Sequence, residues 1–228
     1  MKNAFSRFLL AAVLMAGIIL MPAAVPGVRA MQDTADTAAG ASQRPSDTGA
    51  LHVEGTQLCG ENGQEVILRG VSTHGLTWYP DYVNEKLFRQ VSEEWDCNLV
   101  RLAAYSEEYC RNEESREETM RLQRRGIDAA VAADMYVLAD WHILNDANPN
   151  ENAEAAAVFF ETVSREYGDL PNILYEICNE PNGKTSWADV RAYAEKIIPV
   201  IRANDADAVI IIGTPDFDRD LMASVLDP

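Results

Sequence analysis

Short apolar runs alternate with longer amphipathic segments along most of the chain. Runs with the length and composition of buried strands cover residues 98–103, 136–139, 172–177 and 208–212. Segments with apolar residues three and four positions apart predict helices over residues 84–95, 116–134, 155–167 and 186–201. Strands that alternate with helices in this way are typical of parallel β–α–β units.

Two of the predicted helices carry start signals. Asn84 suits the N-cap of the first, whose apolar face would contain Leu87, Phe88, Val91 and Trp95. Ser186-Trp187-Ala188-Asp189 resembles a capping box before the fourth. Further upstream, residues 51–58 and 65–71 flank the turn signal Glu61-Asn62-Gly63, so we expect the domain to open with a β-hairpin.

The second arm of this hairpin ends near Val71 and begins the alternation, which then contains five strands of a parallel sheet. No glycine-rich phosphate-binding turn follows it in the sequence, which weakens a doubly wound nucleotide-binding fold. The alternative is an α/β (β/α)8 TIM barrel, which has eight strands and typically about 250 residues. We therefore expect residues 51–228 to form the N-terminal part of such a barrel, with about three strand–helix units lacking.

The first 50 residues differ from the rest of the chain. Lys2 and Arg7 precede an apolar run of 14 residues, and Val28-Arg29-Ala30 resembles a cleavage site. We interpret residues 1–30 as a secretory signal peptide; the alternative, an uncleaved anchor, needs a span of about 20 apolar residues. Residues 31–50 lack Leu, Ile, Val and aromatic residues, which predicts a flexible linker. We expect a secreted, extracellular protein with no stable membrane anchor after cleavage.

The net charge of the chain limits the classes of molecule that it can bind. It carries 19 basic and 36 acidic residues, a formal net charge of −17. This balance argues against nucleic acid, because nucleic-acid binding needs a basic surface. The cysteines follow no zinc-binding spacing, so we expect core thiols or one disulfide among Cys59, Cys97, Cys110 and Cys178. We expect no metal, no cofactor and a monomer.

Polar and aromatic residues gather where the predicted strands end. The first strand runs out into residues 72–79, and the later ends are Arg101 to Tyr105, Asp140-Trp141-His142 and Asn179-Glu180-Pro181. Two of the three histidines, His74 and His142, lie at these ends. Because the active site of a TIM barrel forms at the carboxyl ends of its strands, these segments are the candidate active site.

Four of these segments, taken in order, resemble glycoside hydrolase family 5, and especially its bacterial endo-β-1,4-glucanases. They are Ser-Thr-His-Gly-Leu-Thr-Trp-Tyr at 72–79, Asn-Leu-Val-Arg-Leu-Ala-Ala-Tyr at 98–105, Asp-Trp-His-Ile-Leu at 140–144, and Leu-Tyr-Glu-Ile-Cys-Asn-Glu-Pro-Asn-Gly at 174–183. The resemblance runs from about residue 51 to the end of the chain. A lone Asn-Glu-Pro is a weak signal, whereas four motifs that each end a predicted strand form a strong one.

The resemblance implies a retaining mechanism, in which one glutamate protonates the leaving oxygen and a second attacks the anomeric carbon. Glu180 matches the acid/base, and Asn179 matches the residue that binds the sugar 2-hydroxyl. Arg101 matches an arginine that keeps the nucleophile ionised. The structural alternatives are a surface carboxylate in a turn for Glu180 and a salt bridge that supports the barrel for Arg101.

The same resemblance implies a set of substrate-binding residues. His74 and His142 match histidines that contact the substrate, and Asp140 either accepts a hydrogen bond that orients His142 or has a structural role. Trp78 and Tyr79 match a sugar-stacking platform, and Tyr105 matches a tyrosine beside the cleaved sugar. The alternatives are a satisfied core histidine in each case and core packing for the three aromatic residues; Trp141 is expected in the core.

One part of the family pattern is missing from the sequence. The family's nucleophilic glutamate ends the seventh strand, and no residue of this chain matches it. Asp216, Asp218 and Asp220 follow the fifth strand without fitting that motif, so none is nominated. We expect an N-terminal fragment of an enzyme that, expressed alone, is unstable and nearly inactive because its strand edges stay unpaired.

Three functions follow from these considerations. The first is a retaining endo-β-1,4-glucanase, a cellulase that degrades β-glucan. The second keeps the fold and changes the β-linked polysaccharide to mannan, xylan or xyloglucan. The third is a truncated, non-catalytic carbohydrate-binding fragment, which would keep Trp78 and Tyr79 but need no acid at position 180.

Overall fold

The computed structural model describes residues 43–227. The predicted signal peptide, residues 1–30, and the greater part of the predicted linker lie outside the described residues. Within the described part, no helix is long and apolar enough to cross a membrane.

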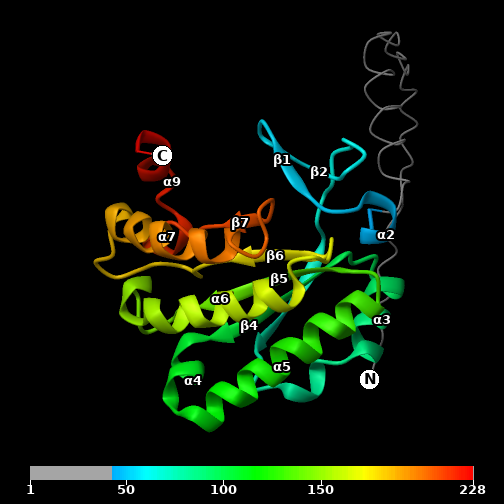
Figure 1. Ribbon diagram of the computed structural model, residues 1–228, viewed down its shortest axis with the longest axis horizontal. Helices are drawn as coiled ribbons and strands as arrows, with labels where there is room; N and C mark the ends of the chain where they lie inside the picture. Colours follow the sequence, from blue (N-terminus) through cyan, green and yellow to red (C-terminus); the bar gives the residue numbers. More distant parts are fainter. Residues whose placement is uncertain (1–42, 228) are drawn as a thin grey trace, which may run out of the picture. The chain divides into compact units, whose positions relative to one another are not determined.

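A parallel sheet forms the centre of the described domain (Figure 1). Its five strands lie in the order β3-β4-β5-β6-β7, with bounds Gly70–Gly75, Leu99–Tyr105, Tyr136–His142, Ile173–Glu176 and Val209–Ile211. The connecting helices are α3 (Glu85–Glu94), α4 (Ser106–Arg111), α5 (Glu113–Ala132), α6 (Ala153–Tyr167) and α7 (Trp187–Arg202). Two short helices follow β7, α8 (Pro215–Asp218) and α9 (Leu221–Leu226), and 3₁₀ turns cover Pro80–Tyr82 and Pro149–Asn152. The expected incomplete α/β barrel is confirmed.

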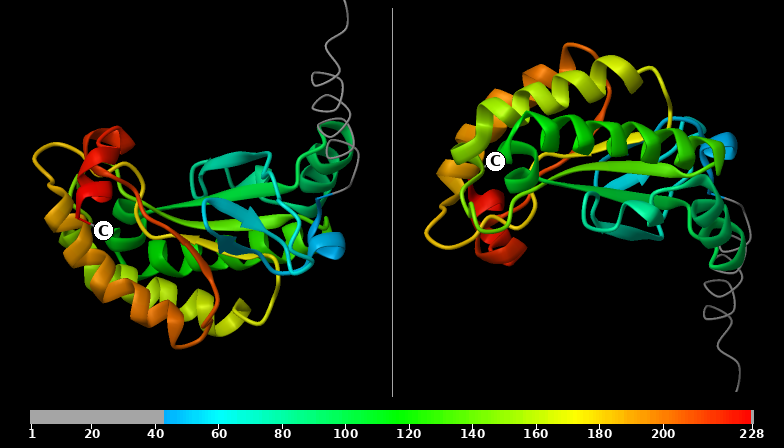
Figure 2. Two further views of the ribbon diagram at one scale, coloured as in Figure 1. Left: turned by 90° about the horizontal axis from the view of Figure 1, so that it is seen from above. Right: turned by 90° about the horizontal axis from the view of Figure 1, so that it is seen from below.

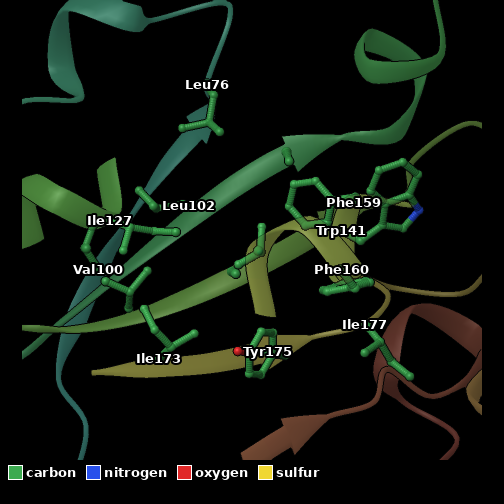
Figure 3. Packing of buried hydrophobic residues seen from close by; sticks show 14 of the residues in the cluster. Leu76, Val100, Leu102, Ile127, Trp141, Phe159, Phe160, Ile173, Tyr175 and Ile177 are labelled. Atoms are coloured by element: carbon green, nitrogen blue, oxygen red, sulfur yellow. The ribbon is translucent and has the colours of Figure 1, made fainter. Parts of the chain in front are cut away.

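The main core lies between the sheet and its helices. Figure 2 shows the long helices α5, α6 and α7 on one side of the sheet. In Figure 3, Trp141 of β5 lies beside Phe159 of α6, and their ring centroids are 5.4 Å apart. Tyr175 and Ile177 extend the same cluster at β6. Trp141 is fully buried, as the sequence predicted.

The opposite, inner face of the sheet has a second and smaller core. Tyr136, Leu138 and Leu174 alternate with the helix-facing residues of β5 and β6, and they pack with Leu51 and Val66 of the N-terminal segment. This segment therefore covers the apolar layer near the amino ends of the strands. The layer beyond it, toward the carboxyl ends, carries charged side chains instead.

The N-terminal hairpin is shorter than the sequence predicted. β1 (His52–Glu54) pairs antiparallel with β2 (Gln57–Cys59), so the chain reverses at Gly55, whose φ is 64°. The predicted turn at residues 61–63 also forms, and it brings Glu65 back to Cys59 through a single bridge. The expectation of one continuous arm over residues 51–58 was wrong because the left-handed conformation of Gly55 interrupts it.

The expectation of a flexible linker was wrong for residues 43–50. Helix α2 (Pro45–Thr48) lies in this segment, and Pro45 and Thr48 are buried. The Gln43 side chain donates to the Glu65 carbonyl and accepts from the Ile67 amide, at 3.0 Å each. Tyr136 donates its hydroxyl to the Gly49 carbonyl at 2.7 Å. Side-chain hydrogen bonds rather than apolar burial hold the segment, so a count of apolar residues missed it.

Two apolar residues are more exposed than the sequence predicted. Asn84 caps α3 as expected, and its side chain accepts from the Leu87 amide. Trp95, however, is 65% exposed, because helix α3 ends at Glu94 and the backbone of Trp95 leaves the helical conformation. The fifth strand was expected to be fully buried, yet Ile211 is 39% exposed, since no strand of the described residues pairs with the outer edge of β7.

Candidate active site

The register of the sheet places the predicted site residues on one face. Asp140 pairs with Ala103 of β4 and with Glu176 of β6, while Tyr105 pairs with His142. Alternate residues of a strand point to the same side, so Arg101 and Tyr105 share a face with this row. It is the inner face of the incomplete barrel, at its carboxyl end.

Arg101 is the centre of a polar cluster on this face. Its Nε and Nη2 donate to the two carboxylate oxygens of Glu176, at 2.6 and 2.9 Å. Nη2 also lies 2.9 Å from Asp140 Oδ2 and 2.9 Å from Asn179 Oδ1. One guanidinium therefore joins strands β4, β5 and β6, and it is a scaffold element as well as a candidate site residue.

The charges in this cluster are unevenly balanced, because two carboxyl groups share one arginine. Burial raises the pKa of Asp140 to about 8, against the lowering effect of Arg101. Asp140 Oδ1 is buried and has no hydrogen-bond partner in the described domain, which also disfavours its charged form. Burial raises the pKa of Glu176 as well, although its hydrogen bond with Arg101 opposes this. Asp140 thus favours its protonated form near neutral pH.

His142 is neutral in this environment. Burial and then the positive charge of Arg101 lower its pKa to about 4. Its Nδ1 lies 2.7 Å from Asp140 Oδ2, so Asp140 orients the ring as the sequence suggested. Nε2 makes no hydrogen bond with a described residue and is not enclosed, which leaves it free to face a bound molecule.

Asn179 is held between two neighbours. Its Oδ1 accepts from Arg101, and its Nδ2 donates to the Ile143 carbonyl at 3.0 Å. The residue is 6% exposed, so its amide orientation is fixed by these bonds. An amide nitrogen carries two hydrogens, and the second has no acceptor among the described residues. That hydrogen is available for a ligand hydroxyl.

Five rings from β3 and the loop after it, and from β4 and β5, form an aromatic cluster, which consists of His74, Trp78, Tyr79, Tyr105 and His142. Tyr105 stacks on His142 with centroids 4.1 Å apart, and it contacts Trp78 at 4.5 Å with the two ring planes tilted by 42°. Tyr105 itself is buried, whereas Trp78 and Tyr79 are 44% and 49% exposed. The exposed rings offer flat apolar faces next to polar side chains, which suits the faces and hydroxyls of a pyranose.

His74 has a defined tautomer within this cluster. Its Nδ1 accepts from the Gly75 amide at 2.8 Å, so the neutral ring carries its proton on Nε2. His74 also has a left-handed backbone conformation, with φ of 58°. Such conformations are costly for residues other than glycine, and they concentrate at functional sites.

The side chain of Glu180 is less constrained than the side chains of Arg101, Asn179 and His142, which are held by hydrogen bonds. It follows β6, its φ is 32°, and its side chain is exposed with no hydrogen bond to a described residue. Its charge contributes to raising the pKa of Tyr105, after the larger effects of burial and of Asp140, so it lies near the aromatic cluster. A carboxyl group beside this aromatic cluster, with no other partner, is free to exchange a proton with a ligand.

Glu176 was not identified from the sequence. A usable signal existed, because both Arg101 and Glu176 interrupt otherwise apolar buried strands. A buried charge requires a partner, so two opposite charges in neighbouring strands predict a pair. The described residues contain no group of three or more His, Cys, Asp or Glu arranged to hold a metal ion. All four cysteines are free thiols.

Comparison with known proteins agrees with this geometry. The family model for cellulase, glycosyl hydrolase family 5, matches residues 59–228. Endoglucanase A of Butyrivibrio fibrisolvens is 46% identical over 183 residues, which cover 78% of this chain and 42% of that protein. Endoglucanase E-5 of Thermobifida fusca is 42% identical over 166 residues, 73% of this chain and 35% of that protein. The chain thus spans about two fifths of the length of these curated relatives.

Solved structures show the same likeness. Cellulase Cel5C_n superposes with a TM-score of 0.75 at 39% identity, covering 79% of this chain and 58% of that one. The catalytic domain of Thermobifida fusca endoglucanase Cel5A, solved in complex with cellotetraose, superposes with a TM-score of 0.71 at 41% identity, covering 76% and 56%. With the family model matching most of its length, this chain belongs to glycosyl hydrolase family 5, the cellulase family.

Proposed function

We propose that this chain carries the acid/base part of a retaining endo-β-1,4-glucanase that hydrolyses β-glucan. The observation that supports this proposal is the position of Glu180, an unpartnered carboxyl group beside the aromatic cluster and next to the anchored Asn179. Endoglucanases are the relatives that share its sequence. Secretion after removal of residues 1–30 belongs to the same proposal, and N-terminal sequencing of the exported protein tests it.

In the first step, Glu180 donates its proton to the glycosidic oxygen while the bond from that oxygen to the anomeric carbon breaks. A carboxylate outside residues 43–227 forms the new bond to that carbon, at about 5–5.5 Å from Glu180 in a retaining site. Glu180 then takes a proton from water, whose oxygen attacks the anomeric carbon and releases the second carboxylate. Glu180 is thereby reprotonated for the next cycle.

The other site residues bind and orient the substrate in this proposal. The free Nδ2 hydrogen of Asn179 donates to the sugar 2-hydroxyl, an interaction that strengthens in the transition state. Trp78 and Tyr79 stack on sugar rings. His74 and neutral His142 offer ring nitrogens to sugar hydroxyls. Arg101 keeps a positive charge below the site, which favours the ionised form of an attacking carboxylate.

Hydrolysis of a soluble mixed-linkage β-glucan by the enzyme that contains both carboxylates tests the activity, with mannan, xylan and xyloglucan as comparison substrates. Glu180→Gln should lower turnover by at least about 100-fold, the usual size of general acid–base catalysis, and should spare cellotetraose binding. Glu107→Gln is the matched control, because Glu107 is an exposed carboxylate on α4 at the same end of the sheet. Undiminished hydrolysis by Glu180→Gln would refute the role of Glu180.

A second assay separates the acid/base from the nucleophile. If the second carboxylate is missing from the assayed chain, added azide takes its place. With cellotetraose as substrate, azide forms a bond to the anomeric carbon as the glycosidic bond breaks and Glu180 protonates the departing oxygen, so a glycosyl azide of inverted configuration accumulates. We expect this product from the chain and from Glu107→Gln, and at least about 100-fold less from Glu180→Gln. Equal azide product from all three proteins would contradict the proposal.

A further inference from the structure

A pocket of about 360 Å³ lies on the far side of the aromatic cluster from Glu180's strand, between the loop after β3 and helices α4 and α5. Its size is within the range of roughly 300–1,000 Å³ for small-molecule sites. Its walls are mainly one tryptophan and polar side chains, namely Trp78, Glu108, Arg111, Glu114, Ser115 and Glu118. Nothing in the catalytic proposal uses the residues of α4 or α5.

Trp78 belongs to both this pocket and the aromatic cluster. Its ring lies 4.5 Å from Tyr105 and 5.1 Å from His74, and it also forms one wall of the pocket. The ring is 44% exposed, so protein atoms do not cover all of it. A glycan that stacks along the aromatic cluster and continues past Trp78 therefore reaches the pocket.

The polar groups of the pocket are of two kinds. Some are held by contacts within the protein and form a fixed wall, and two make no such contact and are free. Glu108 is buried, forms an ion pair with Arg111 and receives a weak hydrogen bond from Thr77. The hydroxyl of Ser115 and the carboxylate of Glu114 make no hydrogen bond with any other described residue. The fixed wall gives the pocket a stable shape, and the free groups can accept hydrogen bonds from a ligand.

The charge of the pocket selects the kind of ligand. Three glutamates face one arginine in its lining, so its formal charge is negative. Glu118 is also paired with Arg121, which lowers the pKa of Glu118 and keeps it ionised. Sugar hydroxyls donate well to carboxylates, because hydrogen bonds to ionised acceptors are stronger than neutral ones. A uronic acid or other anionic substituent would be repelled.

We propose that this pocket is a distal subsite for a neutral sugar residue of the β-glucan chain, adjoining the aromatic cluster at Trp78. The proposal rests on the glucanase function and adds a specificity element to it. The pocket favours long neutral glycans and discriminates against chains with a carboxylate at that residue. Ser115 and Glu114 accept hydrogen bonds from the sugar, and the negative charges of Glu114 and Glu118 disfavour a carboxylate.

Calorimetric titration of the full chain with cello-oligosaccharides of two to six residues tests the proposal. Ser115→Tyr fills the pocket, and Glu117→Tyr places the same bulk on an exposed position of α5 that does not line it. The affinity of the intact protein should rise with length, and Ser115→Tyr should lose about tenfold for the longest oligosaccharides, the loss expected for one or two hydrogen bonds to charged groups. Cellobiose binding should stay the same in all three proteins.

The outcomes separate the two proposals. If the long oligosaccharides bind Ser115→Tyr as tightly as the intact protein, the distal subsite is refuted and the glucanase function is unaffected. If no oligosaccharide binds the intact protein, the glucanase function itself fails. Because Ser115→Tyr can disturb α5, a Glu114→Gln/Glu118→Gln double variant provides a second test. It should reduce the preference for hydroxyethyl-cellulose over carboxymethyl-cellulose by at least about threefold; an unchanged preference overturns the charge selection.

Discussion

Arg101 and Glu176 form a two-point hydrogen-bonded ion pair between strands β4 and β6, with N–O distances of 2.6 and 2.9 Å. The two strands are not neighbours, because β5 lies between them. The pair therefore crosses the inner face of the sheet, and the guanidinium also reaches Asn179. Arg101, positioned by this pair, donates one of the two hydrogen bonds that orient Asn179, the residue before Glu180.

Replacing Glu176 by Gln should destabilise the domain by about 1–3 kcal/mol, below the roughly 3–5 kcal/mol of a fully buried pair, because both side chains are partly exposed. The reason is that Arg101 loses its charged two-point acceptor. Urea denaturation measures the change. Glu161→Gln, which breaks the exposed pair with Arg165, should cost about 0.5 kcal/mol or less. If both substitutions lower the free energy of unfolding equally, the Arg101–Glu176 pair stabilises the domain no more than an exposed ion pair does.

Asp140 and His142 predict an unusual pH dependence of stability. The pKa of Asp140 is raised to about 8, so its contribution is full below pH 3.8 and is lost as the pH rises through 8. The pKa of His142 is lowered to about 4, so its contribution is full above pH 6.5 and is lost as the pH falls through 4. The two slopes oppose each other at acid pH, and of these two groups only Asp140 contributes a slope between pH 6.5 and 8.

In that window the free energy of unfolding should fall as the pH rises, by at most about 1.4 kcal/mol per pH unit. Asp140→Asn should remove this slope, because it cannot ionise and can still bond Arg101 and His142. Urea titrations of both proteins at pH 6.5 and 8 measure the difference. If the slope is the same in both proteins, Asp140 is not the titrating group.

The sequence predicted the position of the site because of a property of parallel sheets. Carboxyl ends of parallel strands meet at one edge, so His74, Tyr105, His142 and Asn179 had to lie together once the strands were recognised. The helices were also predictable where the apolar spacing is regular. Their caps at Asn84 and Ser186 form as the sequence indicated.

Other features depend on strand register and local backbone geometry, which cannot be derived from the pattern of apolar and polar residues. The Arg101–Glu176 contact requires knowing which residues of three strands lie at the same height. The left-handed φ of Glu180 arises from its loop. Residues 43–50 dock through hydrogen bonds rather than apolar surface, so their composition resembles that of a linker.

Gly75 has a packing role that a substitution can isolate. A Cβ at this position would lie 2.8 Å from Cδ2 of Trp78, too close for the ring to stay in place. Gly75→Ala should therefore displace Trp78 and weaken cellotetraose binding about fivefold or more, with little loss of stability because the ring is partly exposed. Gly63→Ala, in a left-handed turn of the N-terminal segment, should do the opposite and cost stability of about 1 kcal/mol without changing binding. Calorimetry and urea denaturation of both variants check this.

Trp78 and Trp95 form a natural pair for testing the aromatic cluster. Trp78 contacts His74 and Tyr105, whereas Trp95 ends helix α3, outside the aromatic cluster, and is 65% exposed. Trp78→Ala should weaken cellotetraose binding about tenfold, or roughly 1.4 kcal/mol, because it removes an exposed ring face on which a sugar stacks. Trp95→Ala should leave the affinity unchanged. Calorimetry measures the affinity of both variants for cellotetraose. Equal losses of affinity would mean that the tryptophans act through the stability of the domain and that the aromatic cluster is not the binding surface.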